Sequence, residues 1–519
     1  MSLFLGKAKS NTGMHPLTQQ TDIQARYTRL ALCMVLGLLI LRLIGLSLSP
    51  LGLHGDEAQY WAWSKDLDWG YFTKPPLIAV TIAATTSIFG DAEWGVRLAS
   101  PILHACTATL IFLTGRTAFD AKTGFWACTI YLLMPALWLS SSIISTDVPL
   151  LLCWVVALNG WINLRRVDIS NKRAWAHALQ IGLAIGIGML AKYAMLFFVA
   201  ALILTVLFDS PTRKALLSAK GIFIIALSAL IISPNIAWNL QNDFATLSHT
   251  ASNANMSDGP SFYPAELGKF LGDQLGVFGP ISFILTLLAI IAAARGHLKA
   301  PALALSFFVL VPLIIISVQA LASRANANWA VTAYIAASLL TAHFCVTYWP
   351  KLKAWLIGSL SVQTLICSSL ALILLSPNLT DSFGLTNSVK RLRAWPQTIN
   401  LLEASFEAGH AGRKYSHIAV DNRMTYYSLN YYGLGENAPL KMWMYAGGPH
   451  NQAELTAPLP ALDGPVLLIN YHADYEAKFR EDFKRLEPLA PLDIDLGGGK
   501  RRVLKLWAGY GYIPTQTRN

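Results

Sequence analysis

The feature that most constrains this chain is a series of apolar runs, each close to the length that a helix needs to cross a lipid bilayer. Hydrophobic residues make up 54% of the 519 positions and charged residues only 13%. The apolar residues are gathered in repeated runs of about 20 residues, which is typical of membrane-spanning helices. The chain is therefore predicted to be a polytopic α-helical membrane protein.

The placement of charge argues against a nucleic-acid-binding protein. The net charge is +11, but lysine and arginine cluster in short loops between the apolar runs. Such loop charge sets the orientation of a membrane protein and does not form a basic binding surface. The six cysteines also lie inside apolar runs, so we interpret them as small core residues rather than disulfides or metal ligands.

The apolar stretch 75–90 decides the topology, because at about 16 residues it is short for a span. If it crossed the membrane, the basic loops after it would alternate between the two sides. If it lies at the interface, they all share the side of the N-terminus, which the positive-inside rule favours. This arrangement has about eleven spans, and up to about thirteen, with the N-terminus inside and the C-terminus outside. The expected spans are 28–50, 95–115, 123–140, 147–165, 175–191, 193–209, 217–236, 270–294, 301–321, 327–347 and 353–376.

Three regions follow from this topology. Residues 1–27 form a polar lead on the inner side, and 28–376 form the transmembrane domain, whose first outer loop covers 51–94. From 377 to 519 the composition changes, which predicts a soluble α/β domain on the outer side.

Local patterns predict elements within this last region. Short apolar runs indicate strands over 418–420 and 466–469, and the pattern over 474–486 indicates an amphipathic helix. The glycine run 497–499, with basic residues after it, indicates a hairpin turn and lacks the spacing of a phosphate-binding loop.

The most informative polar segment is the first outer loop, with the sequence His54-Gly-Asp-Glu-Ala-Gln-Tyr-Trp-Ala-Trp63. Asp56, Tyr60 and Trp63 are spaced i, i+4 and i+7, so a helix would present them on one face. Pro75 is suited to open another helix, and Lys74 would lie beside its N-terminus, which favours anions. A carboxylate and an anion-binding base at a membrane surface indicate chemistry on a phosphate-bearing lipid.

The same residues also have a purely structural interpretation. Asp56 is a favoured N-cap residue, and the tyrosine and tryptophan side chains are suited to an aromatic belt at headgroup level. Taken alone, the residues of this loop leave both interpretations open.

The topology places more ionisable residues on the outer side. Asp147 begins a span, and Lys192 and Arg324 lie at other span ends. Charges near the hydrocarbon are costly and usually functional, so Asp147 is a candidate catalytic residue, and Lys74 and Arg324 are candidate phosphate ligands. The alternatives are that Asp147 caps its helix and that the basic side chains snorkel to the headgroups.

The loop 238–269 is expected to be either a mobile flap or a plain connector on this side. Its polar residues are Asn239, Asp243, His249, Asp258 and Tyr263. No metal site is predicted, because Asp56 and Glu57 are adjacent rather than spaced as metal ligands, and no His/Cys ligand spacing occurs. His54 is expected to support its neighbours rather than bind a metal.

The motifs His54-Gly-Asp-Glu-Ala-Gln-Tyr, Asp68-Trp-Gly-Tyr-Phe, Lys74-Pro-Pro, Arg97-Leu and Ser145-Thr-Asp147 occur in this order. Together they resemble the polyprenyl-phosphate-sugar-dependent glycosyltransferases of the GT-C fold, families 39 and 83, which include protein O-mannosyltransferases and bacterial lipid A aminoarabinose transferases. The resemblance covers about residues 28–345 and does not extend to the C-terminal domain.

The resemblance implies a sugar donor on undecaprenyl phosphate, an inverting transfer on the periplasmic side of the bacterial inner membrane, and no required cofactor or metal. Matched by position, Asp56 is the acid of the first-loop motif, Lys74 the lysine of its Lys-Pro pair, and Asp147 the second acid. The aminoarabinose transferases tend to carry arginine where this chain has Gln59. Arg324 is then the candidate that supplies the remaining charge for the donor phosphate.

We therefore expect a glycosyltransferase that acts on lipid A or a lipopolysaccharide-type glycan, with protein hydroxyls as the alternative acceptor. Asp56 is expected to act as general base, with Asp147 assisting, while Lys74 and Arg324 stabilise the departing phosphate. The residues expected to bind substrate are His54, Glu57, Gln59, Tyr60 and Trp63.

A lipid-linked substrate transporter or flippase is a remote alternative. It predicts ionisable groups near the bilayer midplane and paired broken helices in matching halves, and the sequence indicates neither. The expected partners are the lipid-linked donor, the glycolipid or glycan acceptor and the membrane lipids, and the protein is expected to be a monomer.

Overall fold

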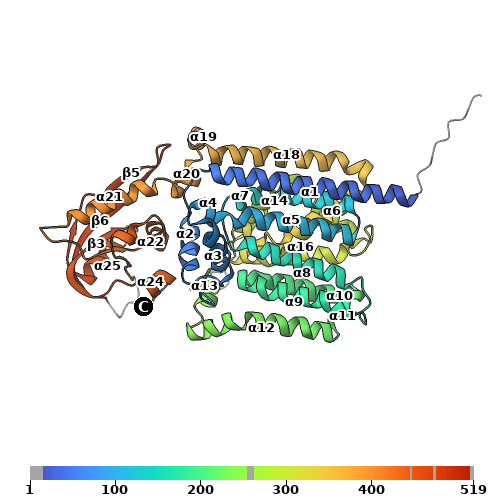
Figure 1. Cartoon of the computed structure of the whole chain (residues 1–519), viewed down its shortest axis with the longest axis horizontal. Helices are drawn as coiled ribbons and strands as arrows, with labels where there is room; N and C mark the ends of the chain where they lie inside the picture. The colour runs from blue at the N-terminus through green and yellow to red at the C-terminus, as the bar shows by residue number, and fades with distance from the viewer. Residues whose placement is uncertain (1–15, 254–261, 445–446, 472–474, 515–519) are drawn as a thin grey trace, which may run out of the picture.

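The computed structural model describes residues 16–253, 262–444, 447–471 and 475–514. They form a bundle of long helices and a smaller domain with a β-sheet, which lies beyond one end of the bundle (Figure 1). The apolar runs of the sequence supply the bundle helices, because a helix satisfies its own backbone hydrogen bonds inside lipid.

The bundle helices are α1 (Pro16–Leu48), α4 (Glu93–Arg97), α5 (Ala99–Ala118), α6 (Ala121–Leu132), α7 (Pro135–Ser140), α8 (Asp147–Leu164), α9 (Arg173–Ala191), α10 (Leu196–Phe208), α11 (Ser210–Leu216), α12 (Ala219–Gln241), α14 (Pro264–Phe278), α15 (Pro280–Ala294), α16 (Ala302–Ala322), α17 (Ala333–Thr347) and α18 (Trp349–Leu375). The short helices between the bundle and the sheet domain are α2 (Gly55–Ser64), α3 (Leu77–Phe89) and α13 (Ala245–Asn253) (Figure 1). Two 3₁₀ turns, Tyr193–Met195 and Ala327–Ala330, interrupt the bundle segments.

Within the described residues, seven helices are long and apolar enough to cross a membrane, and the number rises to nine if each of two bent helix pairs is one span. The protein is thus a multi-span membrane protein, but the predicted count of about eleven is not confirmed. One predicted span, 123–140, is broken between α6 and α7, where Pro135 removes a backbone donor and holds Met134 in extended backbone. Another, 327–347, is α-helical only from Ala333.

The predicted span 270–294 is not one straight helix. It consists of α14 and α15, which are bent by 105° relative to each other. Gly279, at the junction, has a φ of +95°, a conformation that glycine adopts far more readily than other residues. Pro280 follows it and opens α15, so the two residues together explain the bend.

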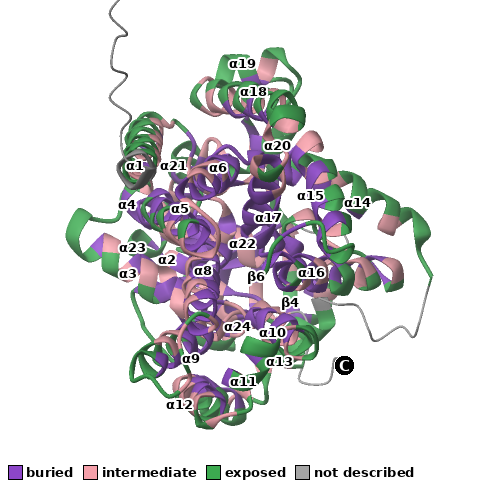
Figure 2. Ribbon diagram, turned by 90° about the vertical axis from the view of Figure 1, so that its right-hand side faces the viewer, coloured by how far each residue is buried: buried purple, intermediate pink, exposed green. Residues whose placement is uncertain are grey.

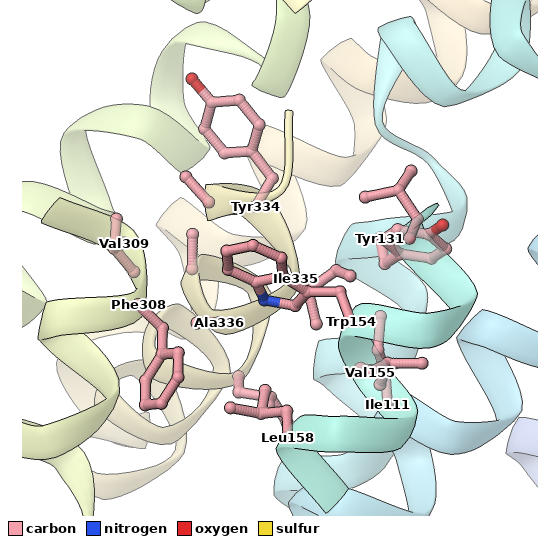
Figure 3. Close-up of a cluster of buried hydrophobic side chains, with 14 of the residues drawn as sticks. Ile111, Tyr131, Trp154, Val155, Leu158, Phe308, Val309, Tyr334, Ile335 and Ala336 are labelled. Atoms are coloured by element: carbon pink, nitrogen blue, oxygen red, sulfur yellow. The ribbon is translucent and has the colours of Figure 1, made fainter. Parts of the chain in front are cut away.

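The core of the bundle lies where α8, α16 and α17 meet. Figure 3 shows Trp154 and Leu158 of α8 facing Phe308 of α16 and Ile335 of α17, and these side chains are fully buried. Viewed along the bundle, buried residues gather at the centre and exposed residues on the outside (Figure 2). Many exposed residues are large and apolar, such as Ile225 on α12, as expected for a surface that faces lipid.

The helices α5 and α6 form a hairpin in the bundle, and glycines on both helices let their backbones come close together. A Cβ atom on Gly124 would lie 2.5 Å from the carbonyl oxygen of Phe112, and one on Gly115 would lie 2.7 Å from the Cα of Gly124. Small residues at such crossings let helix backbones approach each other in membranes.

The C-terminal elements are α19 (Pro377–Ser382), α20 (Thr386–Val389), η4 (Lys390–Leu392), α21 (Trp395–Ala408), β1 (His417–Val420), α22 (Arg423–Tyr431), α23 (Leu434–Asn437), β2 (Leu440–Met442), α24 (Gln452–Thr456), β3 (Leu462–Asn470), α25 (Glu476–Asp482), β4 (Phe483–Pro488), β5 (Leu492–Asp495) and β6 (Arg501–Tyr512). The sheet has the strand order β2-β1-β3-β6-β4, with β5 paired to β6. The pairs of β1 with β2 and β3 are parallel, and all pairs of β6 are antiparallel.

The predicted strands 418–420 and 466–469 are confirmed as parts of β1 and β3. The predicted helix 474–486 is confirmed over Glu476–Asp482, and residue 474 lies outside the described residues. It is wrong over its last four residues, because the chain from Phe483 onward forms β4 and pairs with β6. Tertiary strand pairing there overrides a locally helical pattern. The glycine turn is confirmed: Gly497, Gly498 and Gly499 have positive φ and join β5 to β6, which pair as a hairpin.

We predict that Gly124→Val destabilises the protein by about 1–3 kcal/mol, because the added side chain has no space between α5 and α6. The midpoint of thermal unfolding in detergent should fall by several degrees. Gly358→Val in α18 is the matched control, since nothing in the described structure lies within 4 Å of a Cβ at that position. Equal stability of the two variants would contradict this packing argument.

Candidate active site

The first outer loop forms the helix α2, and His54 caps it. The Nδ1 atom of His54 accepts a hydrogen bond from the backbone N–H of Asp56 (3.3 Å), and the Glu57 carboxylate accepts one from the backbone N–H of His54 (2.9 Å). This reciprocal pair is a capping box. Because His54 provides the cap, the Asp56 carboxylate is not used for capping.

Glu57 and Arg97 form a buried ion pair that secures the start of α2. Arg97 donates from Nε and Nη2 to the two carboxylate oxygens of Glu57 at 2.8 and 2.6 Å, and both side chains are 3% exposed. The backbone N–H of Ile144 also donates to Glu57 (2.9 Å). With its oxygens occupied in this way, Glu57 positions the loop, whereas the sequence analysis expected it to bind substrate.

Arg97 extends the same network to the residues before α2. Its remaining donors reach the carbonyl oxygens of Leu51 (3.0 Å) and Gly52 (2.8 Å). A charged pair held by this many hydrogen bonds keeps the loop in a single conformation.

Asp56 is the half-exposed carboxylate of α2, with 40% of its side chain accessible. Its nearest basic atoms are Nη2 of Arg423 and Nδ1 of His54, each 3.7 Å away. Both distances exceed a hydrogen bond, so among the described residues no side chain donates to this carboxylate. An accessible carboxylate of this kind is able to accept a proton from a bound hydroxyl group.

Gln59, also on α2, is fully buried and connects the loop to the C-terminal domain. Its Oε1 accepts a hydrogen bond from Nη1 of Arg423 (2.7 Å), and its Nε2 donates to Oγ1 of Thr73 (3.3 Å). Arg423 is the first residue of α22. Gln59 stands where the aminoarabinose transferases tend to carry arginine, and here it binds an arginine of the C-terminal domain.

Lys74 lies just before α3 and faces the same group of charges. Burial and the proximity of Lys192 lower its pKa from the ordinary value of 10.5 to about 8, and Arg423 lowers it further, while Asp56 and Asp147 oppose the shift. No hydrogen bond or ion pair joins the Lys74 ammonium group to any other described residue. An unpaired, half-buried cation of this kind is suited to bind an anion.

Asp147 begins α8 and is paired with Lys192 rather than with Lys74. Lys192 Nζ lies 2.7 Å from one carboxylate oxygen, and Nδ2 of Asn328 donates to the other at 2.8 Å. Lys192 lies at the break between α9 and the following 3₁₀ turn. Asp147 is only 7% exposed, so it contacts the cluster from within the bundle.

The aromatic residues of α2 are packed rather than open to a substrate. Trp63 is 3% exposed, and its ring stacks on Tyr71 with centroids 4.4 Å apart. Tyr60 is 6% exposed, and burial raises its pKa well above the ordinary value, with a further contribution from Asp56. These rings stabilise α2, and Tyr60 alone is electrostatically coupled to the acids of the site.

The predicted flap is partly helical. His249, on α13, lies near the cluster: burial first, and then Lys74 and Arg423, lower its pKa to about 4, so it is neutral near pH 7. Asp258 lies outside the described residues. Arg324 is exposed, and its side chain makes no hydrogen bond or ion pair with the part of the chain that the structure describes, so the structure does not join it to the cluster.

The structure also contains a cavity of about 620 Å³ that reaches His54 and Arg97. Its apolar lining comes from α1, α7 and α18, including Leu46, Trp138 and Leu374. The residues with basic side chains that line it are Arg42, His54, Arg97, Lys390 and Arg391. An apolar lining that also contains basic side chains suits an anionic amphiphile.

Sequence reasoning missed Arg423, because no spacing or motif connects position 423 with the loop at 54–74. Its only signal is that a basic residue follows the predicted strand 418–420.

In the described ranges, no group of three or more His, Cys, Asp or Glu side chains is placed to hold a metal ion.

Comparison with known proteins relates the chain to lipid-dependent glycosyltransferases. Residues 73–238 match the family described as dolichyl-phosphate-mannose-protein mannosyltransferase. The chain is 34% identical over 331 residues to the lipid A galacturonosyltransferase RgtD of Rhizobium johnstonii, an alignment that covers 62% of this chain and 67% of that protein.

The fold is shared with solved structures at low sequence identity. ArnT from Cupriavidus metallidurans in the apo state aligns with a TM-score of 0.61 at 14% identity, covering 93% of this chain and 98% of ArnT. The same protein bound to undecaprenyl phosphate aligns with a TM-score of 0.60 at 15% identity, covering 92% and 98%. With its helical bundle, its C-terminal sheet and the relative at 34% identity, this chain belongs to the GT-C family of polyprenyl-phosphate-sugar-dependent glycosyltransferases.

Proposed function

We propose that this glycosyltransferase moves one monosaccharide from an undecaprenyl-phosphate-linked donor to lipid A, with inversion at the anomeric carbon. The observation that carries the proposal is an accessible carboxylate near a cation. Among the described residues, Asp56 accepts no side-chain hydrogen bond and the Lys74 ammonium group has no partner. A base and a phosphate-binding cation side by side match the two charge changes of this reaction.

In the proposed reaction, Asp56 accepts the proton of the acceptor hydroxyl as its oxygen attacks the anomeric carbon. The bond from that carbon to the phosphate oxygen breaks, and undecaprenyl phosphate departs with an additional negative charge. In this proposal Lys74 stabilises this charge, and its half-buried position strengthens the attraction. Attack opposite to the departing phosphate inverts the configuration.

The other predicted residues have supporting roles in this proposal. Asp147 holds Lys192 next to the cluster. Lys192 therefore adds positive charge to the site without itself binding the departing phosphate. Arg324 stays a prediction: as an exposed cation after α16, it would add its charge from the rim of the site. No metal ion or cofactor is assigned a step.

Two observations support a lipid acceptor. RgtD, the relative at 34% identity, is named for transfer to lipid A, and the cavity beside His54 combines an apolar lining with basic residues. Lipid A joins acyl chains to phosphate groups, and the lining of this cavity, which includes His54 two residues before Asp56, would suit both parts. Protein hydroxyls are the second candidate acceptor, because the matched family is described as protein mannosyltransferases.

We further propose that the active site lies on the periplasmic side of the bacterial inner membrane. This side follows from the basic loops, which the positive-inside rule assigns to the cytoplasm. The transmembrane domain would then cover residues 28–376, and the domain 377–519 would lie in the periplasm. We expect a monomer, with the lipid donor, the lipid acceptor and membrane lipids as partners.

The acceptor is tested by mass spectrometry of lipid A and core glycan from cells with and without the gene. We predict that lipid A from the cells with the gene is heavier by one sugar residue, and that expression of Asp56→Asn does not restore this mass. If lipid A is unchanged while a periplasmic protein loses a sugar, the protein acceptor replaces lipid A. If neither changes, the proposed function is incorrect.

The base assignment is tested with the purified protein in detergent. Asp56→Asn should lower kcat by at least about 100-fold, since a general base contributes roughly that factor or more, while binding of undecaprenyl phosphate persists. Asp66→Asn is the control and should be fully active, because Asp66 is an exposed carboxylate two residues beyond the end of α2. Near-normal kcat in Asp56→Asn would rule out the base role.

The phosphate assignment is tested by the pH dependence of binding. Because the pKa of Lys74 is lowered to about 8, Lys74 is charged below that pH, and the affinity for undecaprenyl phosphate should fall as the pH rises through it. A bound anion raises this pKa, which extends the loss to higher pH. Lys74→Arg, whose side chain stays charged, should bind with little change between about pH 7 and about pH 10. Parallel profiles in the two proteins would contradict the assignment.

A further inference from the structure

The C-terminal domain is attached to the first outer loop by hydrogen bonds between distant parts of the chain. The backbone N–H of Gly52 donates to the carbonyl oxygen of Leu392 (3.0 Å), and that of Leu53 donates to the Tyr432 hydroxyl (2.9 Å). The backbone N–H of Phe72 donates to Oε1 of Gln452 (2.8 Å). In Figure 1, α22 lies directly beside α2. These bonds hold α22 against the loop that carries Asp56.

The approach of α22 to α2 is as close as the backbone allows. A Cβ atom on Gly55 would lie 2.9 Å from both Cβ and Sδ of Met424, which is closer than such atoms pack. Met424 is the neighbour of Arg423, so the absence of a side chain at Gly55 lets the start of α22 reach the start of α2. The Arg423 side chain is therefore positioned by two contacts: the close packing of α22 against α2 and its own hydrogen bond to Gln59.

Arg423 leaves most of its hydrogen-bonding capacity unused. A guanidinium group has five donors, yet among the described residues its side chain makes one hydrogen bond, to Gln59. Its exposed fraction is 29%, and Asp56 is 3.7 Å away. Arg423 also contributes to the pKa shifts of Lys74, Tyr60 and His249. Its guanidinium group therefore lies near all three side chains, in the space between α2, α3, α13 and α22.

Positive charge accumulates in this space beyond what the carboxylates neutralise. Asp147 is paired with Lys192, which leaves Asp56 as the acid that faces both Lys74 and Arg423. Like charges placed close together at a half-buried site are unfavourable unless an anion joins them. A planar guanidinium with free donors is well suited to bind a phosphate or carboxylate through two oxygens.

We propose that Arg423 binds an anionic group of the lipid-linked donor, so that the C-terminal domain supplies part of the donor site. This inference rests on the proposed function, because it assumes the same site and the same class of donor. The anionic group is either the phosphate of the donor or a carboxylate on its sugar, and both present paired oxygens to the guanidinium. Gln59 acts as the positioning residue that orients Arg423.

The first test compares Arg423→Gln with the wild-type protein in detergent micelles. The probes are undecaprenyl phosphate and undecaprenyl phosphate bearing galacturonate, and the dissociation constants are measured by calorimetry. We expect Arg423→Gln to weaken binding of the galacturonate donor by about tenfold to about hundredfold, the typical effect of one charge-assisted hydrogen bond. The midpoint of thermal unfolding should stay within a few degrees of that of the wild type.

The matched control is Arg413→Gln, which removes an exposed arginine of the same domain that has no side-chain partner within the described residues. It should bind both probes as the wild type does. The two sources of the anion are separated by the probe without sugar. Weaker binding of undecaprenyl phosphate itself identifies the phosphate as the ligand of Arg423, whereas weaker binding of only the galacturonate donor identifies the sugar carboxylate.

A charge exchange between the two positions gives a second test. An arginine at position 59 extends further than glutamine and reaches toward the space that Arg423→Gln vacates. The double variant Gln59→Arg/Arg423→Gln should therefore recover most of the donor affinity lost in Arg423→Gln. Gln59→Arg alone should bind donor no better than the wild type, because the two arginines repel each other.

The proposal is overturned if Arg423→Gln and Arg413→Gln bind both probes equally well, or if affinity falls only together with thermal stability. That result would leave Arg423 as a structural link between the domains. Failure of the proposed function has a different signature, in which the wild-type protein itself binds neither probe.

Discussion

The buried ion pair of Glu57 and Arg97 is the interaction on which the rest of the site depends. Removing charges from water is costly unless they are paired and hydrogen-bonded, and here both side chains are 3% exposed. The hydrogen bonds of the pair join α2 to three other segments. These are the residues just before α2, with the carbonyl oxygen of Leu51, the helix α4, which carries Arg97, and the residues before α8, with the N–H of Ile144. These bonds hold the loop in an arrangement that leaves the Asp56 carboxylate accessible.

The charged residues of the site come from parts of the chain with different structural roles. The first loop contributes Asp56 and Lys74, the bundle contributes Asp147 with Lys192, and the C-terminal domain contributes Arg423. Asp147 and Lys192 both belong to bundle segments and are held by the packing of the bundle. The first loop and the C-terminal domain are held together by contacts between them, such as that of Gln59 with Arg423. A site assembled in this way depends on correct docking of the C-terminal domain, even though the family match at residues 73–238 does not include that domain.

The electrostatic character of the site follows from its place between the bundle and the domain. Burial lowers the pKa of Lys74 and of His249, which shows that the surroundings disfavour positive charge in the absence of a partner. A negatively charged ligand removes this penalty and is held more strongly than it would be in water.

The sequence by itself determined the features that repeat locally. Apolar runs predicted a multi-span helical protein, and short apolar runs predicted the strands β1 and β3. The i, i+4, i+7 spacing indicated which residues a helix at Asp56 would place on one face. These patterns are reliable because a helix or strand must turn its apolar face to lipid or core at every repeat. The same patterns failed at β4, where pairing with the distant strand β6 decided the outcome. They also failed at the bend between α14 and α15, where Gly279 and Pro280 interrupt an apolar run long enough for one helix.

Only the tertiary structure decided which charges meet. Glu57 pairs with Arg97, 40 residues away, Asp147 pairs with Lys192, 45 residues away, and Gln59 holds Arg423, 364 residues away. From the sequence, Arg324 was as reasonable a partner for the donor phosphate as any other outer arginine. The physical reason is that ionic contacts have no periodicity along the chain: they form where packing of apolar surfaces brings two segments together.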